Sequence, residues 1–429
     1  MSYLLIYASV LGIIFFLYLR RQAKKQQSHA AELQNSLATG LAEPPSLHPL
    51  IDASRCIGSG SCAVVCPEEA LGLVNGKAVL VNASACIGHG ACQAACPFDA
   101  ISLVFGTEKR GIDIPQISPE FETNIPGIFI AGELGGMGLI RKAAEQGRQA
   151  MEFVRKRKSG AADFDVLIVG CGPAGLSAGL SSIRHQLKYK LIEQEDSLGG
   201  AVYQYPRQKI AMTSPVELDL VGQVKFGEVQ KEKLLEFWQD IVKKTGLQIS
   251  FRERMETITP QGDIFAVKTS KGTCTARSVL LAMGRRGTPR KLEVEGEGLP
   301  KVTYRLIDPE QYRDQAVLVV GGGDSALEAA IALSEQPGTR VILSYRSEAF
   351  SRVKQKNRQR LDEQKAAGRL QVLLSSRVIS IQPDAVDIDH QGTTTSHPND
   401  AVIVCAGGLL PMPQLQSMGI HFSTKFGTV

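Results

Sequence analysis

The stretch from Asp165 to Ala178, DVLIVGCGPAGLSA, constrains this chain more than any other. An apolar run rich in β-branched residues leads into Gly170-x-Gly172-x-x-Gly175, and a run rich in Ala, Leu and Ser follows. A strand, a glycine turn and a helix in this order let a pyrophosphate approach the helix N-terminus. Glu193 ends the next apolar run, about twenty residues on, where an acid accepts from a ribose hydroxyl. The stretch therefore predicts a dinucleotide site.

A second glycine turn, Gly321-x-Gly323-x-x-Ala326, follows another apolar run. It predicts a second nucleotide site, of the kind that binds a nicotinamide cofactor. After the next predicted strand the sequence offers Arg346 and Arg352 where an acid would recognise a plain ribose. Basic residues there suit a 2′-phosphate, so NADP(H) is favoured over NAD(H). The alternative is that these basic residues only form a solvated helix face.

Six of the nine cysteines fall in two segments that repeat after thirty residues. Each segment has the spacing C-x5-C-x3-C-P, and Asn75-Gly76 between them is a strong hairpin signal. Cysteines clustered in this way indicate metal or cluster ligation in a reducing compartment, not a disulfide framework. The candidate ligands are Cys56, Cys62, Cys66, Cys86, Cys92 and Cys96.

The chain from about Leu47 to Val104 closely resembles a bacterial two-cluster ferredoxin. In that family four cysteines are spaced C-x2-C-x2-C-x3-C-P, and the fourth ligates the other cluster. The resemblance therefore implies two crossed ligand sets. The first is Cys56, Cys62 and Cys96, and the second is Cys86, Cys92 and Cys66.

The sequence departs from this family at the second cysteine of each motif, which is Ser59 in one and His89 in the other. Three thiolates per site suit a [3Fe-4S] centre. Alternatively, Ser59 or His89 supplies a fourth ligand to a [4Fe-4S] centre, and imidazole in place of thiolate would raise its potential. Two further readings are a degenerate module without clusters and a pair of zinc sites, although the crossed spacing fits clusters better.

The segment from Phe105 to Arg155 resembles the closing motif of thioredoxin-reductase-like flavoproteins. Its features are a strand that ends in Gly132-Glu133, then Arg141 and an Ala-rich helix. The resemblance implies that Gly132 and Glu133 hold the ribityl chain of FAD and that the helix near Arg141 faces the flavin. Glu133 stands where the family has Asp, which lengthens the acceptor.

Family members carry this segment at the end of the chain, whereas here it precedes the first glycine turn. The chain also stops at Lys425 to Val429, where that segment would begin. We therefore expect a circular permutation, which is tolerable because domain termini often lie close together. The alternatives are a truncated chain fused to a linker and a swapped dimer. The expected FAD domain comprises 105–155, 164–295 and 398–429, with the NAD(P) domain at 296–397.

The flavoprotein part is similar to relatives of bacillithiol-disulfide reductase and ferredoxin–NADP reductase of the thioredoxin-reductase type. The redox-active Cys-x-x-Cys that precedes the second fingerprint in thioredoxin reductases is absent, since Tyr304 to Gln315 contains no cysteine. The remaining cysteines, Cys171, Cys274 and Cys405, stand at apolar or strand positions and suit buried structural roles.

The N-terminal run from Tyr3 to Leu19 carries no charge, and a basic stretch begins at Arg20. This pattern predicts a transmembrane anchor at 1–20, with the rest of the chain in the cytoplasm. A cleaved signal peptide and a buried core helix are the alternatives. The polar segment 21–46 is expected to be a helical stalk and linker. Part of the net charge of +5 lies beside the apolar run, which favours a membrane surface over nucleic acid.

The predicted fold class is α/β, with an N-terminal transmembrane helix, a small α+β ferredoxin-like module and Rossmann-like FAD and NAD(P) domains of the three-layer type. The parts indicate a membrane-anchored NAD(P)H-dependent flavin/iron–sulfur oxidoreductase at the inner membrane. Its partner would be a redox protein or a quinone, and a homodimer is possible. One alternative is a reductase of low-molecular-weight disulfides. A non-catalytic alternative is a redox sensor or scaffold.

Overall fold

The computed structural model describes residues 2–38, 43–44, 47–108, 110–136, 138–157, 160–207, 209–212, 215–285, 287–350, 353–409 and 411–427. The chain divides into two compact units. Unit 1 comprises Met1–Ile112, Ser347–Asp362 and Lys425–Val429. Unit 2 comprises Asp113–Arg346 and Glu363–Thr424.

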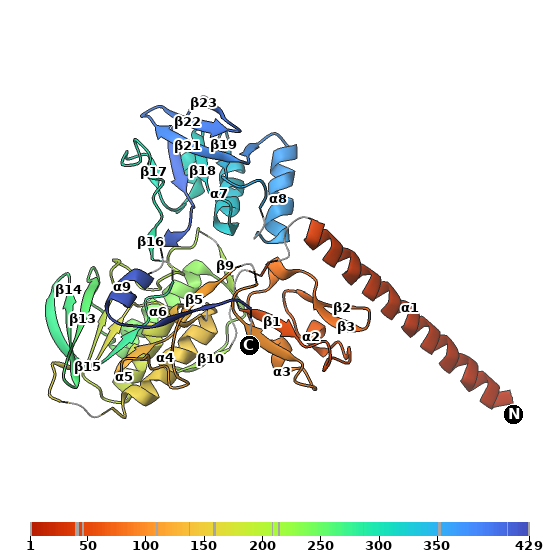
Figure 1. The fold of residues 1–429 in the computed structure, drawn as a ribbon, viewed down its shortest axis with the longest axis horizontal. Helices are drawn as coiled ribbons and strands as arrows, with labels where there is room; N and C mark the ends of the chain where they lie inside the picture. Colours follow the sequence, from red (N-terminus) through yellow and green to blue (C-terminus); the bar gives the residue numbers. More distant parts are fainter. Residues whose placement is uncertain are drawn as a thin grey trace. The chain divides into compact units, whose positions relative to one another are not determined.

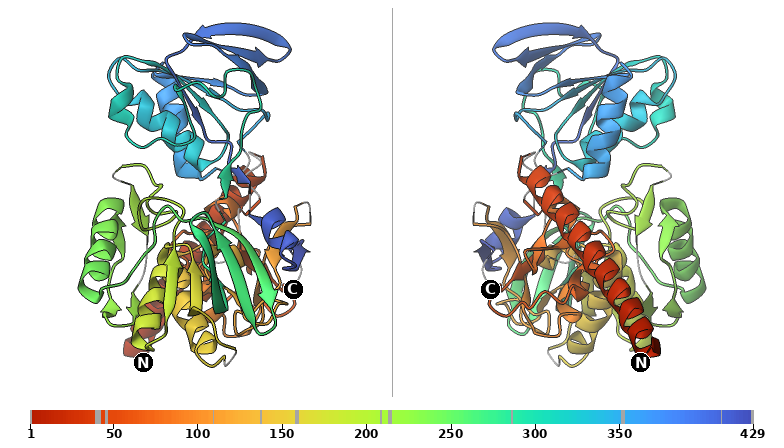
Figure 2. Two further views of the ribbon diagram at one scale, coloured as in Figure 1. Left: turned by 90° about the vertical axis from the view of Figure 1, so that its left-hand side faces the viewer. Right: turned by 90° about the vertical axis from the view of Figure 1, so that its right-hand side faces the viewer.

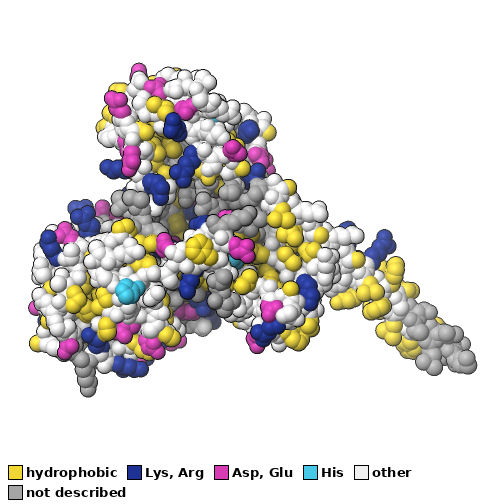
Figure 3. Space-filling model, viewed as in Figure 1, with side chains coloured by type: hydrophobic (Ala, Val, Ile, Leu, Met, Phe, Trp, Pro, Cys, Tyr) yellow, Lys and Arg dark blue, Asp and Glu magenta, His cyan; other side chains and the backbone are white. Residues whose placement is uncertain are grey.

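The N-terminus of unit 1 is one continuous helix, α1 (Ser2–Ala38), which is straight in Figure 1 and in the right-hand view of Figure 2. Large apolar side chains between Ile6 and Leu19 are exposed along it, as the yellow atoms on this helix show (Figure 3). Within the described residues, no helix is both long enough and apolar enough to cross a membrane. The predicted transmembrane helix is therefore not supported. Its uncharged run has 17 residues, which is at the short end of the range for a membrane-spanning helix.

The second half of α1 packs against the cysteine-rich module, although the sequence suggested an exposed stalk. The Nδ1 atom of His29 accepts a hydrogen bond of 2.9 Å from the backbone of Leu73. Ser36 donates to the carbonyl of Val81, and Glu32 accepts from Asn82. These contacts supply hydrogen-bond partners to Leu73, Val81 and Asn82 on or beside the β2–β3 hairpin. If the helix were an exposed stalk, water would have to supply them.

The cysteine-rich module is built from two similar halves, each with a cysteine loop and a one-turn helix. A left-handed glycine precedes each short helix, Gly60 with φ 78° and Gly90 with φ 81°. The module closes by antiparallel pairing of its first and last strands. Its elements are β1 (His48–Ile51), α2 (Ser61–Val64), β2 (Leu71–Val74), β3 (Lys77–Leu80), α3 (Ala91–Ala94) and β4 (Ile101–Val104).

A six-stranded sheet with the order β13-β14-β15-β7-β8, with β6 paired to β15, forms one half of unit 2. The strands β6, β15, β7 and β8 run parallel, and the apolar side chains at their carboxyl ends are buried. The elements are β6 (Ile128–Ile130), α4 (Ile140–Val154), β7 (Phe164–Val169), α5 (Pro173–Arg184), β8 (Tyr189–Ile192), β13 (Met255–Gln261), β14 (Ile264–Thr269) and β15 (Gly272–Leu281).

The segment that precedes the glycine turn in sequence lies inside this sheet. Strand β6 pairs with β15 from Ile128 to Ile130, and α4 packs on α5. The approach of the two helices is so close that a Cβ built on Gly147 would lie 2.1 Å from the carbonyl oxygen of Ala174. Residues 123 to 141 are thus next to the turn at Gly170 within the same chain.

The last described residues lie close to the point where this segment begins. Strand β5 (Ile112–Pro115) pairs with β26 (Phe422–Lys425). Beyond it, the backbone N–H of Gly427 donates to the carbonyl of Phe105 at 2.8 Å. Gly427 therefore lies beside Phe105, the residue at which the expected permuted segment begins.

The other half of unit 2 has a five-stranded parallel sheet, order β17-β24-β18-β19-β20, with a separate three-stranded antiparallel sheet, β21-β22-β23. Apolar side chains from both sheets form one core, which includes Leu318, Val386 and Val402. The elements are β17 (Val302–Thr303), β18 (Ala316–Val320), α7 (Asp324–Ser334), β19 (Arg340–Ser344), β20 (Leu370–Leu373), β21 (Ser376–Ile381), β22 (Ala385–His390), β23 (Thr393–Pro398) and β24 (Ala401–Val404). Helix α8 (Gln355–Ala366) begins in unit 1 and ends in unit 2. The predicted mixed α/β, Rossmann-like architecture is confirmed.

Smaller elements connect the two halves and cover the first sheet. The two halves are joined by a short antiparallel pair, β16 with β25. These elements are β9 (Ile210–Met212), β10 (Val216–Leu218), β11 (Gly222–Val224), β12 (Glu228–Gln230), α6 (Lys231–Thr245), β16 (Thr288–Pro289), β25 (Gly408–Leu409) and α9 (Met412–Ser417).

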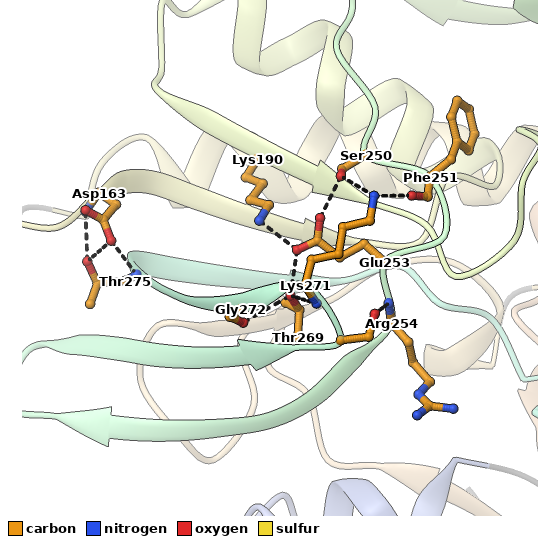
Figure 4. A network of polar contacts seen from close by, with 11 residues as sticks. Asp163, Lys190, Ser250, Phe251, Glu253, Arg254, Thr269, Lys271, Gly272 and Thr275 are labelled. Atoms are coloured by element: carbon orange, nitrogen blue, oxygen red, sulfur yellow. Dashed lines mark hydrogen bonds and ion pairs between the residues drawn. The ribbon is translucent and has the colours of Figure 1, made fainter.

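A buried carboxylate fastens β8 to the β13–β15 hairpins (Figure 4). The side chain of Glu253 is 1% exposed and accepts from Lys190 at 2.7 Å. Ser250 and Thr269 each donate to it at 2.6 Å. Burial opposes ionisation of Glu253, but these hydrogen bonds outweigh it and lower the pKa of the carboxyl below its ordinary value of 4.5.

We expect Glu253→Gln to lower the free energy of unfolding of unit 2 by about 2 kcal/mol at pH 7, because hydrogen bonds to a buried charge are lost. Since the pKa is lower in the folded state, the carboxylate stabilises the fold above pH 4.5, and this contribution disappears as the pH falls further. Urea unfolding at pH 7 and pH 4 measures the difference, which should shrink at the lower pH.

The matched control for this substitution is Glu256→Gln. Glu256 is 30% exposed and, among the described residues, its side chain pairs with surface Lys268 and Arg254. Its replacement should cost less than about 0.5 kcal/mol, as exposed ion pairs do. Equal effects of the two substitutions would show that the buried network is not stabilising.

Candidate functional site

The first cysteine loop forms a cavity lined by Cys56, Ser59, Cys62 and Cys96. Backbone N–H groups point at its sulfur atoms, from Ala78 to Cys56 at 3.5 Å and from Ala100 to Cys96 at 3.4 Å. Lys77 anchors the loop, because its Nζ donates to the carbonyls of Ala53 and Cys56. These groups stabilise negative charge on sulfur, which is the condition for thiolate ligands.

The second cysteine loop forms a separate cavity lined by Cys66, Cys86, His89 and Cys92. The loop is tight at Gly88, which has φ 73° and whose Cβ, if present, would lie 2.8 Å from the carbonyl oxygen of Leu47. The equivalent Gly58 of the first loop has φ 75°, and its Cβ would lie 2.0 Å from the carbonyl oxygen of Gly76. Only glycine fits at either position.

The cavities bring together the two crossed sets that the ferredoxin resemblance implied. Cys96 of the second motif lies in the first cavity, and Cys66 of the first motif lies in the second. Ser59 and His89 line one cavity each. Among the described residues, no group of three His, Cys, Asp or Glu side chains is placed so that it could hold a single metal ion.

The chemistry of the donor set fits a bound iron–sulfur cluster. Burial raises the pKa of Cys62 and Cys86, and burial with neighbouring thiols raises the pKa of Cys92 to about 11. These thiols are therefore neutral near pH 7 unless cations bind among them. The iron of a cluster supplies that positive charge and is held by thiolates.

The first glycine turn connects β7 to α5 and has the shape that a dinucleotide requires. Gly170 has φ 98°, and a Cβ on Gly175 would lie 1.8 Å from the carbonyl oxygen of Gly170. A Cβ built on Gly172 would make only ordinary contacts, the nearest at 3.8 Å to the Cα of Gly200. Glu193 follows β8, is 6% exposed and accepts from the N–H of Cys171 at 2.8 Å. The four predicted residues thus meet at the end of the parallel sheet.

The predicted flavin residues Gly132 and Glu133 follow β6 and lie at the same edge of the sheet. Gly132 has φ 83°, and a Cβ there would lie 3.1 Å from the Cβ of Ala174 on α5. The carboxylate of Glu133 points toward Gly284, whose Cβ, if present, would be 3.7 Å from it. The predicted Arg141 lies in the first turn of α4 and pairs with Glu145 at 3.1 Å.

Two residues near Glu133 were not identified from the sequence. Arg285 donates to the carbonyl of Asp113 at 3.0 Å, and burial lowers its pKa while the Glu133 carboxylate acts in the opposite direction. Tyr205 is largely buried, which raises its pKa, and Glu133 contributes to that shift. The signal for Arg285 was its position directly after Gly284, in a stretch already assigned to the flavin domain. Tyr205 had no comparable signal.

The second glycine turn connects β18 to α7. Gly321 has φ 147°, and a Cβ there would lie 2.3 Å from the carbonyl oxygen of Cys405. Ala326 is fully buried beneath the turn, while Gly323 has open space in front of it. The ring of Tyr345 covers Gly322, within 2.3 Å of where its Cβ would be. The predicted Arg346 follows β19 and is exposed, and Arg352 lies outside the described residues.

The sequence matches two family models. Residues 167–426 match the pyridine nucleotide-disulphide oxidoreductase model, and residues 48–97 match a 4Fe-4S dicluster domain. The chain is 32% identical to a ferredoxin–NADP reductase of Thermus thermophilus over 271 residues, 60% of this chain and 76% of that protein. A ferredoxin–NADP reductase of Pediococcus pentosaceus is 32% identical over 235 residues, 54% of this chain and 68% of that protein.

Solved structures share the fold. A bacillithiol disulfide reductase of Staphylococcus aureus superposes with a TM-score of 0.53 at 26% identity, covering 60% of this chain and 80% of that one. The enzyme of the same description from Bacillus cereus also gives 0.53, at 25% identity, with 60% and 81% covered. The chain therefore belongs to the pyridine nucleotide-disulphide oxidoreductase family, as an FAD-dependent NAD(P)H oxidoreductase that also carries a 4Fe-4S dicluster domain.

Proposed function

We propose that the protein is an NADP(H)-dependent oxidoreductase that exchanges electrons between its nicotinamide cofactor and a protein electron carrier, using FAD and two iron–sulfur clusters. The observation that carries this proposal is the pair of crossed cysteine cavities in a chain that also has two nucleotide-binding glycine turns. The similarity to ferredoxin–NADP reductases supports a redox protein as partner. The direction of electron flow is left open.

The residues at each site have defined roles in this proposal. FAD, when bound, supplies hydride acceptance and release of single electrons, and the clusters supply one-electron transport. The turn at Gly170 would hold the FAD pyrophosphate against the N-terminus of α5, and Glu193 would orient its ribose. Glu133 would accept from the ribityl chain, with Arg285 beside it balancing its charge. The turn at Gly321 would hold the nicotinamide cofactor.

We further propose that each cluster is a [4Fe-4S] centre, with Ser59 and His89 at the fourth position. The positions of these residues support this choice, because each lines the cavity that lacks a fourth cysteine. Under this proposal the two clusters differ in potential, since a neutral imidazole removes negative charge relative to a thiolate. A [3Fe-4S] centre in either site is the alternative that the experiment separates.

Iron, sulfide and flavin analysis of anaerobically purified protein, combined with spin-resonance spectra, tests the proposal. The expected result is one FAD and two clusters per chain, with no signal from the oxidised clusters and a signal after reduction by NADPH. A [3Fe-4S] centre is paramagnetic when oxidised, so a signal before reduction would contradict the assignment of four irons. The absence of both flavin and iron would refute the proposed function itself.

We expect Arg346→Glu to lower kcat/KM for NADPH about tenfold or more, mainly through KM, with little change for NADH. The physical reason is that the substitution replaces an attractive charge by a repulsive one beside the proposed 2′-phosphate. Steady-state kinetics with an artificial acceptor measure both cofactors. The control Arg377→Glu makes the same charge change on β21, where the side chain is 73% exposed. If the NADPH to NADH preference is equal in both variants, Arg346 does not recognise the phosphate.

A second candidate function, reduction of a small disulfide, is favoured by the similarity to bacillithiol disulfide reductases. It predicts NADPH-dependent turnover of a low-molecular-weight disulfide that persists when all six cavity cysteines are replaced. The two functions are separated by that variant, because electron delivery to a carrier protein would be abolished in it.

The order of segments is, in our proposal, a circular permutation rather than a fusion with an unrelated linker, and the pairing of β6 with β15 supports it. The swapped-dimer alternative is not needed, since the segment completes the sheet of its own chain. The location at the cytoplasmic membrane, a quinone partner and a homodimer remain predictions from the sequence, to be tested by cell fractionation, quinone reduction assays and light scattering.

A further inference from the structure

The two cysteine loops end in matching turns that differ in the charge they place beside a cluster cavity. The first motif ends in Cys66-Pro67-Glu68, and the second ends in Cys96-Pro97-Phe98. The backbone of the two turns corresponds, because the next residue is left-handed in each, Glu69 with φ 50° and Asp99 with φ 45°. The acidic side chain of one turn and the aromatic side chain of the other therefore occupy equivalent positions.

Because the two motifs cross, these positions belong to different cavities. Glu68 lines the second cavity, together with Cys86 and His89. Phe98 lines the first cavity, together with Ser59. Among the described residues, Glu68 is the one acidic residue that lines the second cavity, no acidic residue lines the first, and no Lys or Arg lines either. The lining of the second cavity thus carries one carboxylate, and that of the first carries none.

The carboxylate of Glu68 has an oxygen atom that nothing in the described part of the chain stabilises. Its Oε1 atom is out of contact with solvent and accepts no hydrogen bond there. An oxygen in this state costs free energy, because a water molecule or a donor side chain would have stabilised it. Buried polar atoms without a partner are rare in native proteins, and a redox role is one of the reasons for which they persist.

The charge of Glu68 acts on Cys86, one of the proposed ligands of the second site. Burial is the main cause of the raised pKa of the Cys86 thiol, and repulsion from Cys66 and Glu68 raises it further. The same repulsion opposes any added negative charge at the second cavity, because charges interact strongly where water is excluded. Reduction adds one electron to a cluster, so a carboxylate beside the cluster lowers its reduction potential.

We propose that Glu68 lowers the reduction potential of the second cluster through its charge, and so offsets the rise that a neutral imidazole from His89 causes. The inference rests on the proposed function, since it requires a cluster in each cavity. Glu68 acts through the electric field at the cluster and is not itself a ligand. Phe98 adds no charge at the equivalent place, so the first cluster lacks this effect.

Redox titration followed by spin resonance, on the full-length protein with its cofactors bound, measures the potentials of both clusters. We expect Glu68→Gln to shift the equilibrium of one cluster about tenfold toward the reduced form, a rise of about 59 mV for one electron, and to leave the other unchanged. Glutamine keeps the shape of the side chain and removes only its charge.

The matched control is Glu69→Gln. It removes the same charge from the next residue, which is exposed to solvent and does not line the cavity. Its effect on either cluster should be less than about twofold, because water and salt screen an exposed charge.

The internal repeat also permits the reverse experiment. Phe98→Glu places a carboxylate beside the first cavity, and Phe98→Gln makes a similar change of size without the charge. Phe98 is 44% exposed, so neither substitution opens a cavity in the core. Compared with Phe98→Gln, Phe98→Glu should lower by about tenfold the reduction equilibrium of the cluster that Glu68→Gln leaves unchanged.

Three results would overturn the inference while the proposed function stands. The first is an equal effect of Glu68→Gln and Glu69→Gln, and the second is a shift of the same cluster by the changes at positions 68 and 98. The third is a spin-resonance signal from oxidised Glu68→Gln protein, which would show that the carboxylate had been a ligand. Absence of iron from the unmodified protein would instead refute the proposed function, and this inference with it.

Discussion

Replacing Cys56 with Ala is expected to lower the rate of NADPH-dependent reduction of a one-electron carrier protein more than 100-fold. Loss of an outer-shell partner of a metal ligand costs roughly 10–100-fold, and loss of a ligand itself should cost more. Cys56 lines the first cavity with Cys62 and Cys96 and receives an N–H bond from Ala78. Two thiolates cannot hold a cubane in that cavity, so one cluster is lost and the path is interrupted.

The measurement combines iron analysis with two activity assays on the same preparation. Bound iron should fall by about half, because the second cavity keeps its own three cysteines. Reduction of ferricyanide by NADPH should change less than twofold, since ferricyanide takes electrons from the flavin directly. The matched control is Cys274→Ala, a half-buried cysteine on β15 that lines neither cavity. Carrier reduction that survives the loss of iron would contradict a role of the clusters in electron transfer.

Gly147→Ala is expected to cost about 3 kcal/mol of stability in the flavin-binding half and to release FAD during purification. Gly147 is in the middle of α4, and its Cβ would lie 2.1 Å from the backbone carbonyl of Ala174 on α5. A backbone atom cannot move aside as a side chain can, so the two helices must separate, and overpacking of this kind has the largest cost. Because α5 also carries the turn at Gly170, the separation distorts the FAD site.

Gly179→Ala provides the matched control on α5. Its Cβ would lie 2.7 Å from a methyl group of Leu247, the flexible end of a side chain, and the gain in helix propensity of about 1 kcal/mol offsets the adjustment. FAD content after gel filtration and the urea midpoint measured by flavin fluorescence distinguish the two variants. If both behave alike, α4 does not pack on α5 in solution, and the permuted segment does not complete the flavin domain.

The local geometry at both glycine turns could be predicted from the sequence, because positive φ and close backbone approach admit only glycine. Gly170 and Gly321 both have positive φ, and Gly175 meets the carbonyl of Gly170 as the spacing required. The crossed cysteine sets could also be predicted. The cysteine spacing repeats, and the resemblance to two-cluster ferredoxins implies that the last cysteine of each motif ligates the cluster of the other motif. The structure places each crossed set around one cavity, although the bound groups and the roles of individual residues remain predictions.

Other features depended on contacts between distant parts of the chain. The second half of α1 was expected to be an exposed stalk, yet His29 accepts from Leu73 across 44 residues of sequence. Arg285 and Glu133 lie close together although their segments are about 150 residues apart in the sequence. The position of one residue therefore gave no indication of the other. The predicted transmembrane helix is not supported, because within the described residues no helix is both long enough and apolar enough to cross a membrane.

The sequence by itself determined the class of chemistry, because glycine turns and cysteine spacings act through backbone geometry and ligand identity, both of which are local. Only the tertiary structure decided which surfaces meet. It placed β6 beside β15, brought Glu133 next to Gly284, and packed α4 on α5 at Gly147. These outcomes follow from packing between segments far apart in the chain, and the free energy of such packing is not encoded in any single stretch.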